Sequence, residues 1–333
     1  SSVAGVPSRQ FQQIQQYQMI VSENPSATNQ DKAELEEVLK GQDIQAYQKI
    51  YSKTLDKDFK GKAGLQTITL MMIEKEDLTP FIHLQSHQQE LTLKDGVVIT
   101  VKLAQLAGVK VGQTLEIEGK KLKVAAIAEN YVGHFIYMSQ ASYEQLYEQL
   151  PQANTYLVTL KDTSATSIER QAGLLMNQAA VSSVVQNASA IRLFDSVASS
   201  LNQTMTILVI VSVLLAIVIL YNLTNINVAE RIRELSTIKV LGFHNKEVTL
   251  YIYRETIVLS LVGIVLGLVS GFYLHQFLIQ MISPATILFY PQVGWEVYVI
   301  PVAAVSIILT LLGFFVNNHL RKVDMLEALK SVE

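Results

Sequence analysis

The residues whose types and spacing could support metal chemistry are two histidines in the first third of the chain. His83 and His87 are four residues apart, which on a helix would place both on one face, and Glu90 follows closely. Imidazole and carboxylate groups are ligands that Zn²⁺ accepts, but a site needs a third ligand as well as that geometry. Because the stretch is rich in glutamine, exposed polar histidines are the favoured interpretation, and a metal site is the alternative.

A nucleotide site is the second chemistry to test. Gly112 and Gly119-Lys120 resemble a phosphate-binding loop, but six residues separate the glycines where the motif has four. Lys121 stands where the motif needs Ser or Thr to hold magnesium. The sequence therefore predicts no ATP site by this route. No nucleophile and base can be paired by spacing, so we assign no catalytic residue and expect a non-catalytic chain without a cofactor.

The composition is too apolar for a protein that lies wholly in water. Half of the 333 residues are hydrophobic and 17% are charged, whereas soluble domains carry about 25% charged residues. Residues 1–203 hold 18 basic and 21 acidic residues, and residues 204–333 hold only 8 of each. This division predicts a water-facing domain followed by a membrane domain. The lack of a basic excess excludes a nucleic-acid binder, and the lack of cysteine excludes a disulfide scaffold.

Three apolar runs in the second domain are long enough to cross a membrane. They cover residues 205–223, 256–278 and 297–316, and no charged residue occurs between Asp195 and Glu230. At a rise of about 1.5 Å per residue, each run approaches the thickness of the hydrocarbon layer. Each large apolar side chain contributes about −0.3 to −0.6 kcal/mol to insertion. We therefore predict three membrane spans.

The charges of the loops predict the orientation of these spans. The segment between the first two spans and the tail carry basic residues, namely Arg231, Arg233, Lys239, Lys246, Arg254, Arg321, Lys322 and Lys330, whereas residues 279–296 carry none. The positive-inside rule places this segment and the C-terminus in the cytoplasm and residues 1–203 outside the cell. Because a domain of that size must be exported and no signal peptide is visible, we expect a further membrane segment before Ser1.

The first domain alternates strand and helix patterns. We predict an α+β fold in which two α/β lobes flank a β-rich insertion near residues 85–150. In the insertion, apolar and polar residues alternate on both sides of Glu118-Gly119, which indicates a hairpin over residues 115–128. A strand should follow at 134–138, and a capping box at residues 142–145 should open a helix. The lobes contain predicted strands at 17–21, 65–73, 155–160 and 180–185, and helices at 31–40 and 164–178.

The last part of the first domain becomes helical from about Arg192. This helix would continue unbroken into the first span, because no breaker interrupts it. It would tie movement outside the membrane to movement within it.

The segment between the first two spans, residues 228–246, has the pattern of an amphipathic helix that Gly242 ends. Its apolar residues, Val228, Ile232, Leu235, Ile238 and Leu241, form one stripe, and its charged residues lie largely off that stripe. A solvated helix on the membrane surface and a helix that docks on a cytoplasmic partner both explain this pattern.

The second span carries a second pattern, a stripe of small residues. Gly263, Gly267 and Gly271 are spaced four apart, which allows another helix to approach closely. Arg254 and Glu255 precede the core of this span. They are explained by pairing and by extension of the arginine towards the membrane surface, or they mark an ion path.

These features together resemble the FtsX-like permease family, the transmembrane subunits of MacB-type ABC systems. The resemblance rests on residues 230–242, Glu255, the glycine stripe and the ending Asp324–Lys330, although family members often have Pro near Met325 and Arg in place of Lys330. Residues 131–139 and the ending are similar to large bacterial permeases with two such modules. The chain looks like the second module of one.

The resemblance implies a mechanism in which a separate cytoplasmic ATPase pushes on the 228–246 segment. The spans would pass this movement to the extracytoplasmic domain. On this interpretation Glu230, Arg231, Arg233, Glu234, Lys239 and Gly242 form the ATPase-coupling segment, and the glycine stripe holds the moving helices together. The implied partners are the ATPase, the lipid bilayer and a second permease module or subunit. A membrane-anchored receptor or scaffold that acts without ATP is the alternative. A secondary transporter is disfavoured because the spans lack buried ionisable residues.

Overall fold

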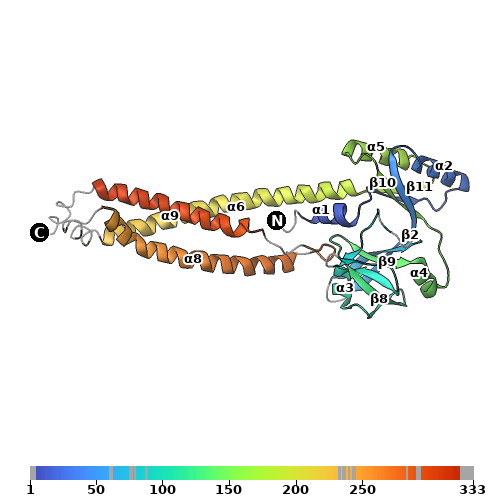
Figure 1. Ribbon diagram of the computed structural model, residues 1–333, viewed down its shortest axis with the longest axis horizontal. Coiled ribbons are helices and arrows are strands. Elements are labelled where there is room, and N and C mark those ends of the chain that lie inside the picture. Colours follow the sequence, from blue (N-terminus) through green and yellow to red (C-terminus); the bar gives the residue numbers. More distant parts are fainter. Residues whose placement is uncertain are drawn as a thin grey trace. The chain divides into compact units, whose positions relative to one another are not determined.

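The structure is a computed structural model that describes residues 5–59, 63–74, 78, 80–86, 89–231, 234, 238, 241, 245–282, 284–289 and 294–322 (Figure 1). The chain divides into two units. The sheet unit comprises Ser1–Ala198 and Ile282–Tyr290, and the helical unit comprises Ser199–Met281 and Pro291–Glu333. A mixed α/β sheet followed by three long apolar helices confirms the predicted fold class.

The sheet unit is built on one nine-stranded sheet, in the order β11-β1-β10-β2-β3-β9-β6-β8-β7. The β3–β9 and β6–β8 pairs are parallel, and the other pairs are antiparallel. A separate hairpin consists of β4 (Gln85–Ser86) and β5 (Gln89–Glu90). The strands of the sheet are β1 (Met19–Glu23), β2 (Ile44–Phe59), β3 (Gly64–Ile73), β6 (Val97–Thr100), β7 (Thr114–Ile117), β8 (Lys120–Ala128), β9 (His134–Ser139), β10 (Thr155–Leu160) and β11 (Val181–Gln186).

The long strand β2 joins two parts of the sheet, which we call the first lobe and the second lobe. Residues 44–50 pair with β10, and residues 51–59 pair with β3 on the other edge of the strand. In the first lobe, α2 (Asn29–Leu39) and α5 (Ala165–Met176) cover one core, with Leu35 and Leu175 fully buried in it. In the second lobe, α3 (Val101–Ala107) and α4 (Gln140–Tyr147) contribute to another core. The lobes therefore share a sheet. Each has a core of its own, and a third cluster that includes Ile50, Leu157 and Tyr137 joins them.

Local signals in the sequence explain where several elements begin and end. Thr28 caps α2 through a capping box, in which the Asp31 N–H donates to Thr28 Oγ1 and the Thr28 N–H donates to the Asp31 carboxylate. The turn between β7 and β8 has Glu118 and Gly119 at positive φ, as a tight two-residue hairpin requires. The capping box predicted at Ser142 is wrong. Ser139 is the cap of α4, and the Ser142 N–H donates to its Oγ from within the first turn.

The predicted strands and helices of the lobes are confirmed within two residues at each end. The hairpin over residues 115–128 and the strand that begins at His134 are confirmed as well. At the end of the domain, α6 (Asn187–Glu230) is continuous over 44 residues, which confirms the predicted helix from Arg192 into the first span.

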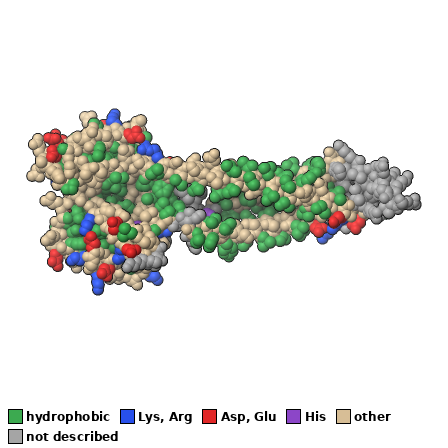
Figure 2. All heavy atoms as spheres, turned by 180° about the vertical axis from the view of Figure 1, so that it is seen from behind, with side chains coloured by type: hydrophobic (Ala, Val, Ile, Leu, Met, Phe, Trp, Pro, Cys, Tyr) green, Lys and Arg blue, Asp and Glu red, His purple; other side chains and the backbone are tan. Residues whose placement is uncertain are grey.

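The helical unit contains the rest of α6 together with α8 (Asn245–Ile282) and α9 (Glu296–Lys322). All three helices include segments long and apolar enough to cross a membrane, which agrees with the predicted spans. Near one end of the unit they pack through Val228, Tyr253 and Val316. Hydrophobic side chains cover the helices, and charged side chains gather at the end of the unit beside the atoms drawn in grey (Figure 2).

A buried charge cluster holds the first lobe together. The Glu23 side chain is only 5% exposed, and its carboxylate lies 2.6 Å from Lys49 Nζ and 3.2 Å from Lys32 Nζ. The Tyr156 hydroxyl donates to it at 2.8 Å. Burial alone would raise the pKa of the Glu23 carboxyl, but the hydrogen bonds from Lys49, Tyr156 and Lys32 outweigh burial and lower its pKa.

Replacing Glu23 with Gln is expected to destabilise the sheet unit by about 2 kcal/mol at pH 7, because three donors lose a charged acceptor. A carboxyl with a lowered pKa stabilises the fold at neutral pH, and this contribution is lost as the pH falls from about 4.3, the ordinary value for Glu, through the folded-state pKa. Thermal unfolding of the full chain in detergent at several pH values would measure both effects. The exposed Glu37→Gln is the matched control, and an equal loss in both variants would contradict the prediction.

Candidate functional site

The described residues contain no cluster of three or more His, Asp or Glu side chains that could hold a metal ion. His83 does not lie on a helix. His83 lies just before the β4–β5 hairpin in a non-helical stretch, and its Nδ1 is 3.9 Å from the exposed carboxylate of Glu90. His87 lies outside the described residues. The neighbouring residues are extended, and Gln85 pairs with Glu90 and Ser86 with Gln89 in an antiparallel hairpin.

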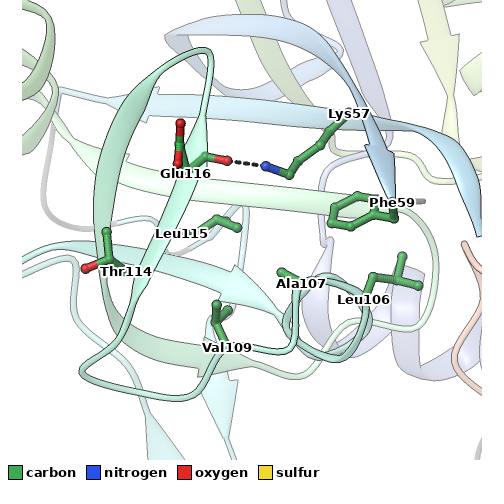
Figure 3. Close-up of a pocket in the computed structure, with 8 residues that line it drawn as sticks. All are labelled: Lys57, Phe59, Leu106, Ala107, Val109, Thr114, Leu115 and Glu116. Atoms are coloured by element: carbon green, nitrogen blue, oxygen red, sulfur yellow. Dashed lines mark hydrogen bonds between the residues drawn. The ribbon is translucent and has the colours of Figure 1, made fainter. Parts of the chain in front are cut away.

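The sheet unit has an open pocket of about 390 Å³ between the end of β2, the end of α3 and the edge strand β7 (Figure 3). Its lining mixes apolar and polar side chains. The one polar contact drawn there is made by Lys57, whose ammonium group donates to the main-chain oxygen of Glu116. The residues around it are Lys57, Phe59, Leu106, Ala107, Val109, Thr114, Leu115 and Glu116. The pocket can receive an apolar group but brings together no nucleophile and base.

The 228–246 segment is described only in part. Glu230 is the last residue of α6, and Glu230 and Glu234 are exposed. Arg233, Lys239 and Gly242 lie outside the described residues, as does the ending Asp324–Lys330 that carries part of the resemblance. The amphipathic helix predicted here therefore stays a prediction.

An ion pair joins the first part of this segment to the helix that follows it. Arg231, one residue beyond α6, donates through Nη2 to Glu255 Oε2 on α8 at 2.7 Å. The Arg231 side chain is 36% exposed and that of Glu255 is 52% exposed. The pair confirms the interpretation of Glu255 as a paired residue. The two residues are 24 positions apart, and Glu255 lies ten positions after the first residue of α8, so the pair ties the end of α6 to α8.

The glycine stripe of α8 faces open space within the described part of the chain. No atom that counts as a contact lies within 4 Å of the position a Cβ would take at Gly263, Gly267 or Gly271. At Gly313 on α9, by contrast, the corresponding position lies 3.7 Å from the Tyr253 ring. The contact between α8 and α9 within this chain therefore does not use the stripe, and the stripe is available to a helix from elsewhere.

A contact that the sequence did not predict lies within the sheet unit, between residues 130–133 and residues 284–289 of the loop that joins α8 and α9. We call it the loop contact. The Leu288 N–H donates to the Tyr131 carbonyl and the Gly133 N–H donates to the Thr286 carbonyl, both at 2.8 Å. Val132 and Ile287 form an antiparallel bridge between these hydrogen bonds. The loop is therefore paired to the sheet unit through its backbone.

A buried glutamine fixes the backbone that receives this loop. Gln10 lies in the π-helical turn η1 (Arg9–Ile14), which follows α1 (Val6–Ser8), and is fully buried. Its Nε2 donates to Asn130 Oδ1 at 2.8 Å, and its Oε1 accepts the Tyr131 N–H at 2.7 Å. Asn130 Nδ2 in turn donates to the Val132 carbonyl at 2.7 Å. Because these groups are buried, each lost partner would leave an unsatisfied polar atom.

Apolar side chains pack beside this hydrogen-bond network. The cluster draws from the N-terminal helices, the 130–133 segment, the start of α6 and the loop, and its members are Val6, Ile14, Tyr131, Val132, Phe194, Leu288 and Phe289. Gly133 has φ +81°, and a Cβ there would come within 3.0 Å of the Phe135 ring, so this position requires glycine. Backbone hydrogen bonds, apolar packing and a required glycine therefore all support the loop contact.

The sequence carried only a faint signal for the loop contact. Residues 131–139 were part of the family resemblance, but nothing in their pattern indicated a partner more than 150 residues away. A single glutamine among the several between Gln10 and Gln18 has no distinguishing sequence context.

Two solved structures are similar to part of the chain. The solved structures similar to the chain include the periplasmic region of MacB from Actinobacillus actinomycetemcomitans, with 12% identity, a TM-score of 0.32 and coverage of 55% of this chain and 94% of that one. They also include the extracellular domain of the noncanonic ABC-type transporter YknZ from Gram-positive bacteria, with 15% identity, a TM-score of 0.30 and coverage of 51% and 98%.

No curated protein matches the chain. One family model matches residues 206–325, and its description is FtsX-like permease C-terminal. This range includes the later part of α6, the apolar segments Tyr253–Ile279 and Glu296–Asn318, and the loop contact's residues 284–289. Residues 206–325 of the chain are therefore similar to the C-terminal part of FtsX-like permeases.

Proposed function

We propose that the chain is the permease subunit of an ABC transporter complex and that it transmits ATP-driven movement of a cytoplasmic ATPase to its sheet unit. The family match of residues 206–325 carries this proposal. In this orientation the sheet unit is extracytoplasmic, and the 228–246 segment and the C-terminus are cytoplasmic, as the positive-inside rule indicates. ATP would be hydrolysed on the partner chain. The output would be export, substrate extraction or peptide resistance.

The 228–246 segment would receive the movement. Glu230, Arg231, Arg233, Glu234 and Lys239 would contact or orient the ATPase, and Gly242 would end the docking helix. The ion pair between Arg231 and Glu255 supports this role, because a push on the loop would act on α6 and α8 together. The continuous helix α6 and the paired loop between α8 and α9 would then carry the movement to the sheet unit.

The direct test removes charge from the described face of this segment. The double variant Glu230→Ala/Glu234→Ala should weaken ATPase binding about tenfold, the equivalent of about 1.4 kcal/mol, because both carboxylates are exposed where the partner would dock. Binding would be measured between the full chain in nanodiscs and a Walker-motif ATPase that co-purifies with it. Glu296→Ala at the start of α9 is the matched control. Equal binding by all three proteins would overturn the docking role.

The glycine stripe would pack against a second permease module or subunit. Open space at all three glycines supports this assignment. Gly267→Leu is therefore expected to leave the thermal stability of the isolated chain unchanged but to abolish its association with another permease module, because a leucine prevents the close approach of helices. Cross-linking in membranes would measure the association. A destabilised chain that still associates would show that the stripe packs internally.

The pocket beside β7 keeps one alternative open, a membrane-anchored receptor or scaffold that binds a ligand without ATP. An open pocket of about 390 Å³ with both apolar and polar side chains suits part of a peptide. Affinity purification of the full-length protein from cells separates the two functions. A co-purifying ATPase with Walker motifs supports the transporter, and its reproducible absence supports the receptor.

A further inference from the structure

A groove of about 410 Å³ lies at the end of the helical unit where α6 ends. It is lined by Arg231, Arg254, Glu255, Val258 and Leu259. Arg231 directly follows α6, and Arg254 is the second residue of the apolar segment Tyr253–Ile279. Both arginines therefore stand at the border of an apolar helix, which is the level of the lipid headgroups when these helices cross a bilayer.

The charges of the groove favour an anion. Arg231 donates through one nitrogen to Glu255, so its other guanidinium donors are not used by this ion pair. Arg254 is exposed and makes no hydrogen bond or ion pair with any residue that the structure describes. The two guanidinium groups and one carboxylate leave a net charge of about +1 on the groove. Guanidinium groups bind phosphate with two parallel hydrogen bonds, which makes a phosphate the best-matched anion.

The remaining lining is apolar and lies deeper. Val258 and Leu259 are one helical turn beyond Arg254 and Glu255, which places them about 6 Å further into the membrane. Their side chains are 54% and 53% exposed. When these helices cross a bilayer, an acyl chain can pack against both side chains while its phosphate binds the arginines, whereas a water-soluble anion uses only the arginines. The groove therefore combines a headgroup site with a surface for a lipid tail.

We propose that this groove binds one anionic phospholipid, with its phosphate between the guanidinium groups of Arg231 and Arg254 and an acyl chain along Val258 and Leu259. The bound lipid would neutralise Arg254 and fill the space between the ends of α6 and α8. It would make the ion pair of Arg231 with Glu255 sensitive to the composition of the membrane. The proposal requires that the helices cross a bilayer but does not require an ATPase.

Photo-cross-linking of the full chain in phosphatidylcholine nanodiscs tests this site. The probe is phosphatidylglycerol with a photoactivatable acyl chain, and the labelled peptides are mapped by mass spectrometry. Labelling is expected on the peptide that contains Val258 and Leu259. Unlabelled phosphatidylglycerol should compete with the probe, whereas phosphatidylcholine and glycerol 3-phosphate should not.

Variants of Arg254 give the second arm of the test. Arg254→Gln should reduce labelling about fivefold, because one cationic contact with the headgroup is lost. Arg254→Lys should retain most of it, because the positive charge remains. Arg192→Gln is the matched control and should label like the wild type, because Arg192 lies near the first residue of α6, far along the helix from Arg231.

Four outcomes would overturn the proposal. Labelling spread evenly over the helices, or equal competition by phosphatidylcholine, would show ordinary contact with the bilayer. Competition by glycerol 3-phosphate would show a site for a soluble phosphate. Unchanged labelling of Arg254→Gln, even if ATPase binding were lost, would show that Arg254 serves a protein partner. The competition arm uses the wild-type protein and so remains decisive if a variant fails to fold.

Discussion

Replacing Arg231 or Glu255 alone with Ala is expected to reduce ATP-driven coupling by 2- to 30-fold, about 0.5–2 kcal/mol of coupling energy. The reciprocal exchange Arg231→Glu/Glu255→Arg should restore much of it. The reason is the 2.7 Å contact between these side chains, which ties the end of α6 to α8. Stability should change by less than about 1 kcal/mol, because both side chains are partly exposed. Coupling would be measured as stimulation of the partner's ATP hydrolysis in proteoliposomes.

A double-mutant cycle separates this role from direct docking. If Arg231 acted only by touching the ATPase, the exchanged protein would stay defective, because a glutamate would stand at the docking position. If the pair acts as a tie between helices, the two single losses would not add. Additive losses without rescue would therefore contradict the tie, while leaving the docking role of Glu230 and Glu234 to its own test.

Sequence reasoning was accurate where the signal was local. The strand at 155–160 is buried along its whole length and is flanked by turn residues, and its bounds were predicted without error. The hairpin at Glu118-Gly119 followed from a turn that only a few residues can form. The continuity of α6 followed from the absence of breakers over 44 residues. In each case neighbouring residues contain the determining information.

Sequence reasoning failed where the partner is distant. In β2, the buried residues Ile44, Ile50, Leu55 and Phe59 do not alternate, because the strand pairs with β10 over its first part and with β3 over its second. Its spacing therefore resembled neither a regular strand nor a loop. The histidine spacing near residue 83 was compatible with a helix, but the stretch forms an extended hairpin instead. The pairing of strands is a tertiary property that overrides local periodicity.

The loop contact follows the same rule, since it joins Gln10, Tyr131 and Leu288 across most of the chain. It also gives the loop between α8 and α9 a place in the proposed mechanism. Covalent connection alone would leave the loop between α8 and α9 free to move independently of the sheet unit. Backbone pairing to residues 130–133 gives the sheet unit a second attachment to the membrane helices, in addition to α6.

Gln10→Leu is expected to release this second attachment. The change leaves Asn130 Oδ1 and the Tyr131 N–H without their buried partner, at a cost of about 2 kcal/mol. Amide exchange at Leu288 should then accelerate about 30-fold, because its hydrogen bond to Tyr131 opens more often. Stimulation of the ATPase should persist, whereas the ATP-dependent change in exchange within the sheet unit should be lost. Gln13→Leu, at an exposed position of the same turn, is the matched control.

A disulfide can then replace the lost hydrogen bonds. Val132 and Ile287 face each other between the two backbone hydrogen bonds of the loop contact. In this arrangement the two Cα atoms are about 4.5 Å apart, a distance that a disulfide can span. The chain itself contains no cysteine, so the double variant Val132→Cys/Ile287→Cys should form one defined disulfide. Added to Gln10→Leu, it should restore the ATP-dependent response under oxidising conditions and lose it again on reduction. Failure of the bond to restore the response would mean that Gln10 acts on the sheet unit alone and that the loop does not transmit movement.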